Sequence, residues 1–557
     1  MLDQINQSIR IILSEALKSI VPDGAEFPTV DLEIPSDASN GDFASNLALK
    51  SAKILRKNPA EIAGDLAQLV ERCIRNSPEL KGAIAKVEVK AGFINFFLSP
   101  EVWRSFVPEM IRQADGYGTL THGRGVKIMV EFVSANPTGY LSVAHGRQAA
   151  VGDALANVLK AAGYDVHREF YVNDCGNQIR MLGLSLKCRA LEALGKTVEF
   201  PADGYQGEYV KEMAKEFMQD RGIKALSQLQ EVSDEYYSHY AKEYLLGVIR
   251  QELDDFGVRF DAWTFESKVA DAKSLEAAVK FLKERGHIYE QDGALWFKTT
   301  AFGDDKDRVI RKSDGTYTYF MPDIVYHKNK FDRGFDRVYD LLGPDHHGYI
   351  GRLKAAAQAL GRKKEDLEVL IIQLVTLTSN GEVVQMSKRS GKYITLRDVM
   401  DEVGVDAARF FLLMRSRSAH LEFDLQLAKK QSSENPVYYI QYAHARVYSL
   451  DQKAAEAGIR PAKDLSLLKE AEEIDLIKRM AHFSDMILIA ATALDPHPVV
   501  SYLQDLAAHF HKFYDCHRII DASNQELSSQ RLALCHAARV VIGNGLRILG
   551  VSAPEKM

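Results

Sequence analysis

Residues 134–166, SANPTGYLSVAHGRQAAVGDALANVLKAAGYDV, decide how the rest of the chain is interpreted. They follow an apolar run at 128–132 that is typical of a short buried strand, and they pass through a turn rich in Asn, Pro and Gly. A long helical pattern begins at Gly146. A strand, a turn and a helix N-terminus in succession form an anion site, because unpaired backbone N–H groups and the positive end of the helix dipole meet there. His145 lies at that point, where it can donate a hydrogen bond to a developing phosphate charge, so the segment predicts a phosphate-handling site.

Strands and helices alternate from about residue 126 to 424. A second strand is predicted at 167–172, and two more at 338–342 and 369–377. This alternation predicts an α/β, doubly wound (Rossmann-like) sheet that binds its ligands at the C-terminal ends of the strands. A charged amphipathic stretch at about 190–285 is expected to be a helical insertion in this domain.

Two further regions flank the alternating one, which we place at 115–425. Residues 1–110 hold helical patterns followed by strand patterns at 86–90 and 92–98, which predicts a small N-terminal α+β domain. Residues 434–557 are helical in period almost throughout, which predicts a C-terminal all-α bundle. Its expected helices are 438–450, 473–494, 499–519 and 530–549.

The bulk composition is that of an ordinary globular protein. The chain has 557 residues, too many for one hydrophobic core, and a formal net charge of −6, which gives no global attraction to nucleic acid. We find no long uncharged apolar run that could span a membrane and no secretory signal at the N-terminus, so a cytoplasmic protein is expected. The five cysteines form no C-x-x-C pair, which argues against disulfides and structural zinc; they are Cys73, Cys175, Cys188, Cys516 and Cys535.

A second candidate phosphate site is the loop GEVVQMSKRSG at 381–391. It follows the last predicted strand, and two glycines bracket Ser387, Lys388 and Arg389. Hydroxyls and cations on a loop flanked by glycines suit the clamping of a polyphosphate. A short basic loop is usually only solvated, so this indication depends on the His145 turn.

These two elements resemble the HIGH and KMSKS signatures of class I aminoacyl-tRNA synthetases. Further segments are similar to the bacterial type of the arginyl-tRNA synthetase family, and the resemblance covers essentially the whole chain in order. The segments are SANPTG at 134–139, GRQAAVGDALANVL at 146–159, FYVNDCGNQI at 170–179, GPDHHGY at 343–349, SGKYITLRDVMDEVG at 390–404, DAARFFLLMRS at 406–416, NPVYYIQYAHAR at 435–446 and the terminal APEKM.

The resemblance implies an arginine–tRNA ligase. Such an enzyme joins arginine to ATP, releases pyrophosphate and moves the arginyl group to the 3′-terminal ribose of arginine tRNA, a displacement that needs positioning and charge stabilisation. By resemblance His145 and Lys388 are catalytic, and ATP enters with Mg²⁺ as its substrate complex, without a tightly bound metal. The implied ATP contacts are Ser142, Ala144, Gly146, His346, His347, Met386, Ser387 and Arg389.

An arginine pocket is implied as well. A guanidinium group is planar and permanently charged, so a selective pocket needs carboxylates in its plane and an aromatic or apolar wall. By resemblance Tyr319, Asp323 and Glu266 hold the guanidinium, and Ser134 and Asn136 hold the α-amino and carboxylate groups. Without the resemblance, Tyr319 would be interpreted as a core aromatic residue and Asp323 as a turn or cap residue.

Two regions are expected to contact tRNA. Phe93 and Asn95 resemble the family's aromatic and amide residues that hold a D-loop base, since unpaired bases are bound by stacking and amide hydrogen bonds. The helical domain is expected to bind the anticodon through Tyr438, Tyr442 and Arg446, with Tyr439 and His444 nearby, although some of these side chains must form the core.

The chain departs from the family pattern at three positions. Ser142 and Ala144 replace a His and a Gly of the HIGH signature, and Gln385 replaces the first Lys of KMSKS. One lost transition-state donor costs ~3 kcal/mol if nothing replaces it. We expect Arg389 or Arg147 to compensate. The alternatives are a synthetase for another amino acid and a catalytically silent tRNA-binding paralogue; in either case a monomer without a membrane partner is expected.

Overall fold

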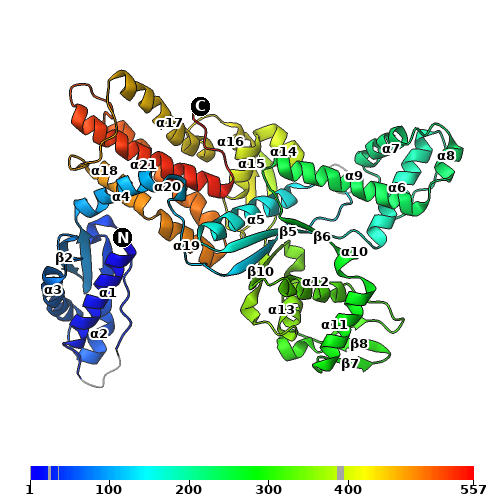
Figure 1. The fold of residues 1–557 in the computed structure, drawn as a ribbon, viewed down its shortest axis with the longest axis horizontal. Helices are drawn as coiled ribbons and strands as arrows, with labels where there is room; N and C mark the ends of the chain where they lie inside the picture. Colours follow the sequence, from blue (N-terminus) through cyan, green and yellow to red (C-terminus); the bar gives the residue numbers. More distant parts are fainter. Residues whose placement is uncertain (1, 23–26, 36, 385–393) are drawn as a thin grey trace. The chain divides into compact units, whose positions relative to one another are not determined.

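The computed structural model describes residues 2–22, 27–35, 37–384 and 394–557 (Figure 1). The contacts divide the chain into two compact units. The first comprises Met1–Ala114, Ser449–His482 and His509–Val540, and the second comprises Asp115–Tyr448, Phe483–Ala508 and Val541–Met557.

A five-stranded parallel sheet forms the centre of the second unit. Its strand order is β11-β10-β4-β5-β6, so the direction in which the chain adds strands reverses between β4 and β10. The predicted doubly wound α/β fold is therefore confirmed. The strands are β4 (Lys127–Glu131), β5 (Asp165–Val172), β6 (Ala262–Phe265), β10 (Arg337–Leu342) and β11 (Leu367–Ile371).

Helices cover both faces of this sheet. α5 (Val143–Ala161) lies so close to β4 that a Cβ atom on Gly152 would come within 2.2 Å of the Phe132 ring. On the opposite face, α13 (Ile350–Ala359) packs on β4, β10 and β11, and α12 (Phe320–Asp332) directs polar side chains onto β4 and β10. Since successive strand residues face opposite sides, Met129 and Glu131 share the α12–α13 face.

The apolar run at 369–377 is two strands, so the prediction of one strand there is wrong. β11 ends at Ile371, whereas β12 (Val375–Ser379) pairs with β13 (Glu382–Val383) and β14 (Leu421–Asp424) in a separate sheet of order β13-β12-β14. The chain changes sheets at Gln373, whose N–H donates to the carbonyl of Arg417. Apolar residues stand on both sides of Gln373, and one polar residue is too weak a signal to divide the run, so the sequence pattern did not reveal the change. The helices that follow in this unit are α14 (Leu396–Val403), α15 (Val405–Leu412) and α16 (Leu425–Lys429).

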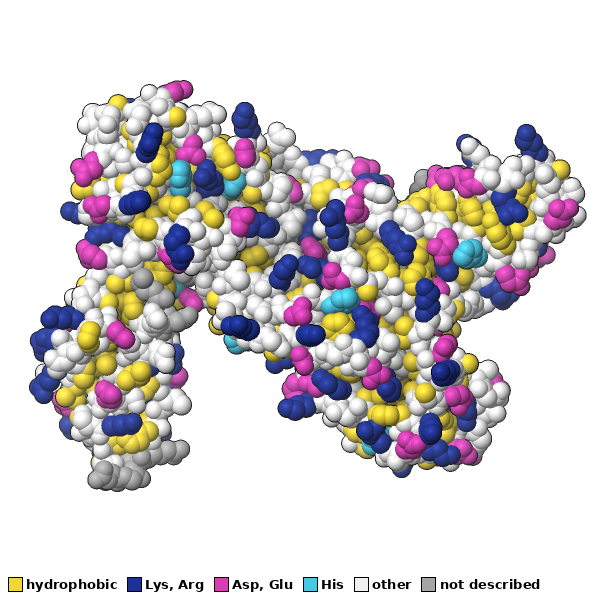
Figure 2. All heavy atoms as spheres, viewed as in Figure 1, with side chains coloured by type: hydrophobic (Ala, Val, Ile, Leu, Met, Phe, Trp, Pro, Cys, Tyr) yellow, Lys and Arg dark blue, Asp and Glu magenta, His cyan; other side chains and the backbone are white. Residues whose placement is uncertain are grey.

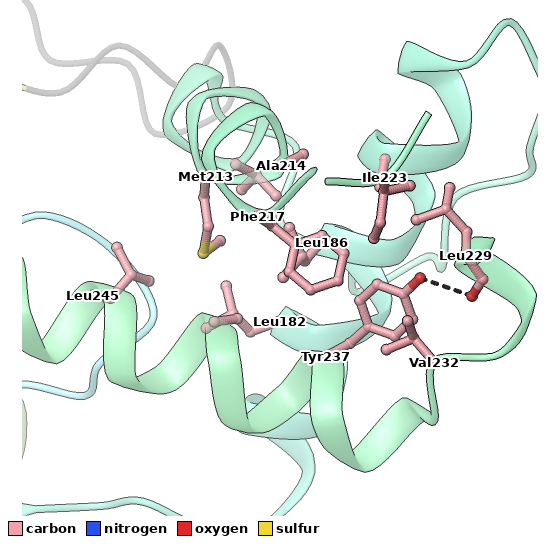
Figure 3. Close-up of a cluster of buried hydrophobic side chains, with 13 residues drawn as sticks. Leu182, Leu186, Met213, Ala214, Phe217, Ile223, Leu229, Val232, Tyr237 and Leu245 are labelled. Atoms are coloured by element: carbon pink, nitrogen blue, oxygen red, sulfur yellow. Dashed lines mark hydrogen bonds between the residues drawn. The ribbon is translucent and has the colours of Figure 1, made fainter. Parts of the chain in front are cut away.

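The helical insertion is shorter than expected, because β6 returns the chain to the main sheet. Its lobe is closed by a cluster of buried apolar side chains, in which the Tyr237 hydroxyl donates to the Leu229 carbonyl over 3.0 Å (Figure 3). The lobe consists of α6 (Asn177–Ala193), α7 (Glu208–Asp220), α8 (Leu226–Gln230) and α9 (Asp234–Asp255). After β6 come α10 (Glu266–Val269), α11 (Ala272–Glu284) and an antiparallel sheet of β7 (Ile288–Gln291), β8 (Ala294–Phe297) and β9 (Arg308–Arg311).

The first unit contains the predicted N-terminal α+β fold. Its antiparallel sheet has the order β1-β3-β2, and β1 was not predicted because it is only three residues long. The elements are α1 (Leu2–Lys18), β1 (Phe43–Ser45), α2 (Leu47–Leu55), α3 (Pro59–Asn76), β2 (Ile84–Lys90), β3 (Phe93–Leu98) and α4 (Pro100–Gln113).

The remaining helices carry the predicted C-terminal all-α region. The single helix expected at 473–494 is wrong, because His482 separates two helices. α21 is long and apolar enough to cross a membrane by length and composition, but 72% of its most apolar window is buried inside the protein. The helices are α17 (Pro436–Glu456), α18 (Ala471–Ala481), α19 (Phe483–Ala493), α20 (His497–Cys516) and α21 (Gln525–Leu549).

Charged side chains of both signs are interspersed on the face shown in Figure 2. No single sign dominates that face, in keeping with the small formal net charge of −6. Any attraction for an anionic partner must therefore come from local groups.

Candidate active site

The candidate site lies where the strand order reverses, at the C-terminal ends of β4 and β10. In open α/β sheets ligands bind at this switch point, because the loops diverge to opposite faces and leave a crevice. The turn at residues 132–142, which we call the β4–α5 turn, follows β4. The segment Pro344–Tyr349 follows β10 as a 3₁₀ helix and carries His346 and His347, both exposed.

The β4–α5 turn begins with a strained backbone. Val133 and Ser134 have φ values of 67° and 39°, a region that β-branched residues in particular disfavour. The Ser134 hydroxyl donates to Glu131 over 2.9 Å and accepts from the backbone N–H of Tyr171 over 3.1 Å. These bonds fix Ser134 between β4 and β5. Asn136, further along the turn, is exposed and donates to Gln178 over 2.9 Å.

His145 is held by Ser142, the N-cap residue of α5. Its Nδ1 accepts from the Ser142 backbone N–H over 3.1 Å and lies 3.1 Å from the Ser142 hydroxyl, which in turn caps the His145 backbone N–H. This arrangement leaves the proton on Nε2. Burial lowers the pKa of His145, so the imidazole is a neutral donor. Ser142 thus has a capping and positioning role that comparison with the HIGH signature did not suggest.

The neighbours of His145 differ in their surroundings. Ala144 is exposed, whereas Gly146 is buried, and a Cβ atom there would lie 2.7 Å from Cδ1 of Leu396. Leu396 is the first residue of α14, and Thr395 before it forms an antiparallel bridge with Ser142. The start of α14 therefore contacts the β4–α5 turn directly.

Arg147 does not reach the turn as a compensating cation, so this part of our expectation is wrong. Its side chain is fully buried, and its guanidinium donates to the backbone carbonyls of Gln373, Leu374 and Ser416 over 2.8–3.1 Å. Burial lowers its pKa to about 10. Arg147 instead satisfies the carbonyls at the point where the chain leaves β11 for β12. The residues Gln385, Met386, Ser387, Lys388 and Arg389 lie outside the described part of the chain.

Three carboxylates gather around Tyr171, and we call them the acidic cluster: Glu131, Asp323 and Glu266. The pKa of Tyr171 is raised by burial and then by the charges of Glu266, Asp323 and Glu131. Burial raises the pKa of Asp323 to about 7, although it accepts a hydrogen bond from Tyr349. Burial also raises the pKa of Glu266, which accepts from the Cys175 thiol and the Tyr171 hydroxyl. Carboxylates with raised pKa values form a site that a cation would stabilise.

Tyr319 precedes Asp323, a member of this cluster, on α12. It is the N-cap residue of α12, one turn before Asp323, and 86% of its surface is exposed. The interpretation of Tyr319 as a core residue is therefore excluded. An exposed aromatic side chain one helical turn from a buried carboxylate is free to cover a bound guanidinium group.

A buried ionic network supports the cluster, and the sequence analysis missed it. Lys330 on α12 is fully buried and donates to Glu131 over 2.5 Å and to Asp340 over 2.7 Å. His327 Nε2 lies 2.8 Å from Asp340, and its Nδ1 lies 2.7 Å from the Asp323 carbonyl. The signal in the sequence was a charged residue near the end of each of two buried strands, in KIMVE and RVYDLL. Among the described residues, no group of three or more His, Cys, Asp or Glu is placed to hold a metal ion.

The residues expected to contact tRNA lie far from this site in the sequence. Tyr438 and Tyr442 stack with ring centroids 6.2 Å apart, and the Arg446 guanidinium lies 5.0 Å from the Tyr442 ring, which gives an aromatic–cationic row on α17. His444 faces inward, with Nδ1 2.9 Å from the Pro554 carbonyl. A cavity of about 550 Å³ includes Tyr438 in its lining.

The two predicted D-loop contacts differ in access. Both lie on β3, where Phe93 is half-buried and Asn95 is only 3% exposed. Stacking of a base needs an accessible ring, which Phe93 partly offers.

The parallel sheet, its switch point and the β4–α5 turn fit the catalytic domain of a class I tRNA synthetase, and a family model identifies it as one. A family model described as "tRNA synthetases class I (R), catalytic domain" matches residues 107–431. Models described as "Arginyl tRNA synthetase N terminal domain" and "DALR anticodon binding domain" match residues 7–98 and 440–557. The chain belongs to the arginyl-tRNA synthetase family.

Full-length relatives agree with this assignment. The chain is 45% identical over 561 residues to an "Arginine--tRNA ligase" of Bacillus velezensis, covering 99% of this chain and 100% of that one. It is 44% identical to the Bacillus subtilis protein of the same name, with the same coverage. The arginyl-tRNA synthetase structure from Thermus thermophilus matches with a TM-score of 0.76 over 99% of this chain and 100% of that one; at 23% identity this supports the fold alone.

Proposed function

We propose that the β4–α5 turn and the acidic cluster together form the site at which this enzyme activates arginine. The protein is an arginine–tRNA ligase: it uses ATP to convert arginine to arginyl-adenylate and transfers the arginyl group to tRNA. The observation that carries the site assignment is the position of three carboxylates, Glu131, Asp323 and Glu266, beside the turn that leads into α5, whose first turn bears His145.

On the ATP side, His145 is the donor to the α-phosphate as negative charge develops there. A neutral imidazole with its proton on Nε2 needs no further proton transfer to act in this way, and it costs no reorganisation during the reaction. Lys388 is the second catalytic residue, and Mg²⁺ accompanies the ATP phosphates. The further ATP contacts are Ser142, Ala144, Gly146, His346, His347, Met386, Ser387 and Arg389.

On the arginine side, Asp323 and Glu266 bind the guanidinium and Tyr319 covers it. Ser134 and Asn136 hold the α-amino and carboxylate groups, and the strained turn sets their spacing from His145. Binding energy from the remote guanidinium then orients the reacting carboxylate toward the α-phosphate.

The tRNA contacts are assigned to the flanking domains. Phe93 and Asn95 in residues 1–110 hold a D-loop base, and Tyr438, Tyr442 and Arg446 in residues 434–557 hold anticodon bases on the row along α17. The catalytic domain is assigned to residues 115–425. We further propose a cytoplasmic monomer that has no membrane partner.

Arginine-dependent exchange of pyrophosphate into ATP, run with and without arginine tRNA, tests this function. We expect exchange that needs arginine and is strongest with tRNA present. Lysine or citrulline in place of arginine should support none, because neither offers a charged planar fork. Binding of tRNA without arginine-dependent exchange under either condition would leave the silent paralogue as the function.

A further inference from the structure

Glu252 is a buried acidic residue that the proposed chemistry leaves without a role. It lies near the C-terminal end of α9, the last helix of the insertion, and is 3% exposed. A buried carboxylate costs free energy unless it is hydrogen-bonded, so its partners indicate why it is there.

Both partners of Glu252 are backbone N–H groups at the candidate active site. Oε1 accepts from the N–H of Arg397 over 2.9 Å, and Oε2 accepts from the N–H of Leu141 over 3.4 Å. Leu141 precedes Ser142 in the β4–α5 turn, and Arg397 lies in the first turn of α14. One side chain of the insertion therefore bonds two active-site segments that are more than 250 residues apart in the sequence.

The two segments also meet through their backbones, directly beside Glu252. The Leu396 N–H donates to the Leu141 carbonyl over 2.8 Å, and Ser142 and Thr395 form the antiparallel bridge. Leu396 packs on Gly146 in the first turn of α5. Since Ser142 holds His145 through Nδ1, a shift at this junction would move the imidazole.

The charged groups around Glu252 support a bridging role. The Arg397 side chain pairs with Asp255, one turn along α9, so the end of α9 holds the start of α14 through both residues. Burial raises the pKa of Glu252 to about 7, and the two N–H donors and the Arg397 charge oppose that rise, whereas Asp398 adds to it. The N–H groups in the first turn of a helix have no partner within the helix, so the carboxylate also caps α14.

We propose that Glu252 is a positioning residue of the synthetase site, which fixes the β4–α5 turn against the N-terminus of α14 and so sets the position of His145 for ATP. The inference rests on the proposed function. Through Glu252, the helical insertion would help to align the residues that bind ATP.

The test is the isosteric variant Glu252→Gln, assayed by pyrophosphate exchange in the full-length enzyme with tRNA. An amide offers one acceptor and one donor group, so one of the two backbone N–H groups loses its partner. We expect kcat/KM for ATP to fall about ten-fold, the range for an unpaired buried group, while KM for arginine changes less than about two-fold. Glu252→Asp, which keeps the charge but shortens the reach, should fall between the wild type and Glu252→Gln.

Two controls on α9 separate positioning from stability. Ile249→Val removes one buried methylene group a turn before Glu252 and lowers stability without touching the carboxylate, and Glu235→Gln changes an exposed carboxylate. Neither control variant should change kcat/KM for ATP. The proposal is overturned if Ile249→Val affects ATP as strongly as Glu252→Gln, or if KM for arginine rises in step with that for ATP.

Hydrogen exchange gives a readout that is independent of activity. The backbone amides of peptides that contain Leu141 or Arg397 should exchange hydrogen faster in Glu252→Gln than in the wild type. Glu252→Asp replaces this variant if Glu252→Gln fails to fold. In Ile249→Val the exchange of the same peptides should be unchanged. Unchanged exchange at both sites would refute the bridging role even if activity fell. Failure of the wild type in the arginine-dependent pyrophosphate exchange assay would instead refute the proposed function. The hydrogen-exchange result would then still decide whether Glu252 bridges the two segments.

Discussion

The β4–α5 turn and the acidic cluster lie next to each other and are built in opposite ways. The turn is held by backbone groups and by neutral side chains, Ser142 and His145, and burial keeps His145 uncharged. The cluster is held by carboxylates, and burial raises the pKa values of Asp323 and Glu266. The first arrangement suits negative charge that appears only during the reaction, and the second suits a ligand that arrives already positive. Glu131, which bonds Ser134 on one side and Lys330 on the other, joins the two.

Lys330→Met should cause the largest change, because it removes the cation from the network beneath the cluster. Glu131 and Asp340 would remain buried without their shared partner, and breaking such a buried pair costs about 3–5 kcal/mol. Urea denaturation followed by circular dichroism measures this loss. The control Lys328→Met removes a partly exposed lysine that pairs with Asp332 on the same helix, and it should cost less than about 1 kcal/mol. An equal loss of unfolding free energy in the two variants would show that the buried ionic network does not stabilise the protein.

Asp323→Asn tests the cluster itself and should affect the arginine side alone. Loss of a charged hydrogen bond to a guanidinium costs about 2–3 kcal/mol, so kcat/KM for arginine should fall roughly 30- to 150-fold. KM for ATP should stay near its wild-type value, because the β4–α5 turn is held by other groups. The steady-state exchange assay at varied arginine and at varied ATP measures both, with the exposed Asp332→Asn as the matched control. A parallel rise in KM for ATP would contradict the separation of the two regions.

The sequence was sufficient for the turn and insufficient for the cluster, and the reason is where their residues come from. The strand, turn and helix at 128–162 are contiguous, so local patterns predicted them, and His145 was found with them. The cluster draws on β4, β5, α10 and α12, and only folding brings these elements together. Asp323 and Glu266 were predicted through the family resemblance, whereas Glu131, Lys330 and Asp340 were missed.

The other errors have physical causes of the same kind. The run at 369–377 is apolar except for Gln373 and Thr376, and a single polar residue does not end a strand pattern, so the tertiary bonds at Gln373 separate β11 from β12. The break at His482 interrupts a helical pattern that continues in the sequence. Arg147 was predicted as a free cation because sequence cannot show that backbone carbonyls use its donors.

The pH dependence of arginine binding should also distinguish the cluster from the turn. Burial raises the pKa of Asp323 from 3.8 to about 7, so the folded protein keeps a proton there that the unfolded chain loses near pH 4. The stability contributed by this proton is present below pH 3.8 and is lost as the pH rises through about 7.

Arginine favours the charged carboxylate, so its affinity should rise as the pH increases through 7. It should be about ten-fold weaker one unit below the pKa of Asp323 than at a pH where that carboxylate is fully charged. Calorimetry in buffers of different ionisation enthalpy measures the proton that arginine releases. Asp323→Asn should remove this release. An affinity for arginine that is constant from pH 6 to 8 would show that Asp323 is already charged in the free protein.

Ser142→Ala should have the smallest effect on the rate of adenylate formation. The size of this effect shows whether the hydroxyl or the backbone of residue 142 sets the tautomer of His145. The variant loses the N-cap of α5, which costs about 1 kcal/mol, and it loses the hydroxyl beside His145 Nδ1. The backbone N–H of residue 142 still donates to Nδ1, so the proton should stay on Nε2 and kcat should fall only about five-fold, whereas His145→Ala should cost ~3 kcal/mol. Ser142→Thr keeps the hydroxyl and should retain most activity. Single-turnover rates of adenylate formation compare the three variants, and a loss in Ser142→Ala as large as that in His145→Ala would mean that the hydroxyl, and not the backbone, sets the tautomer of His145.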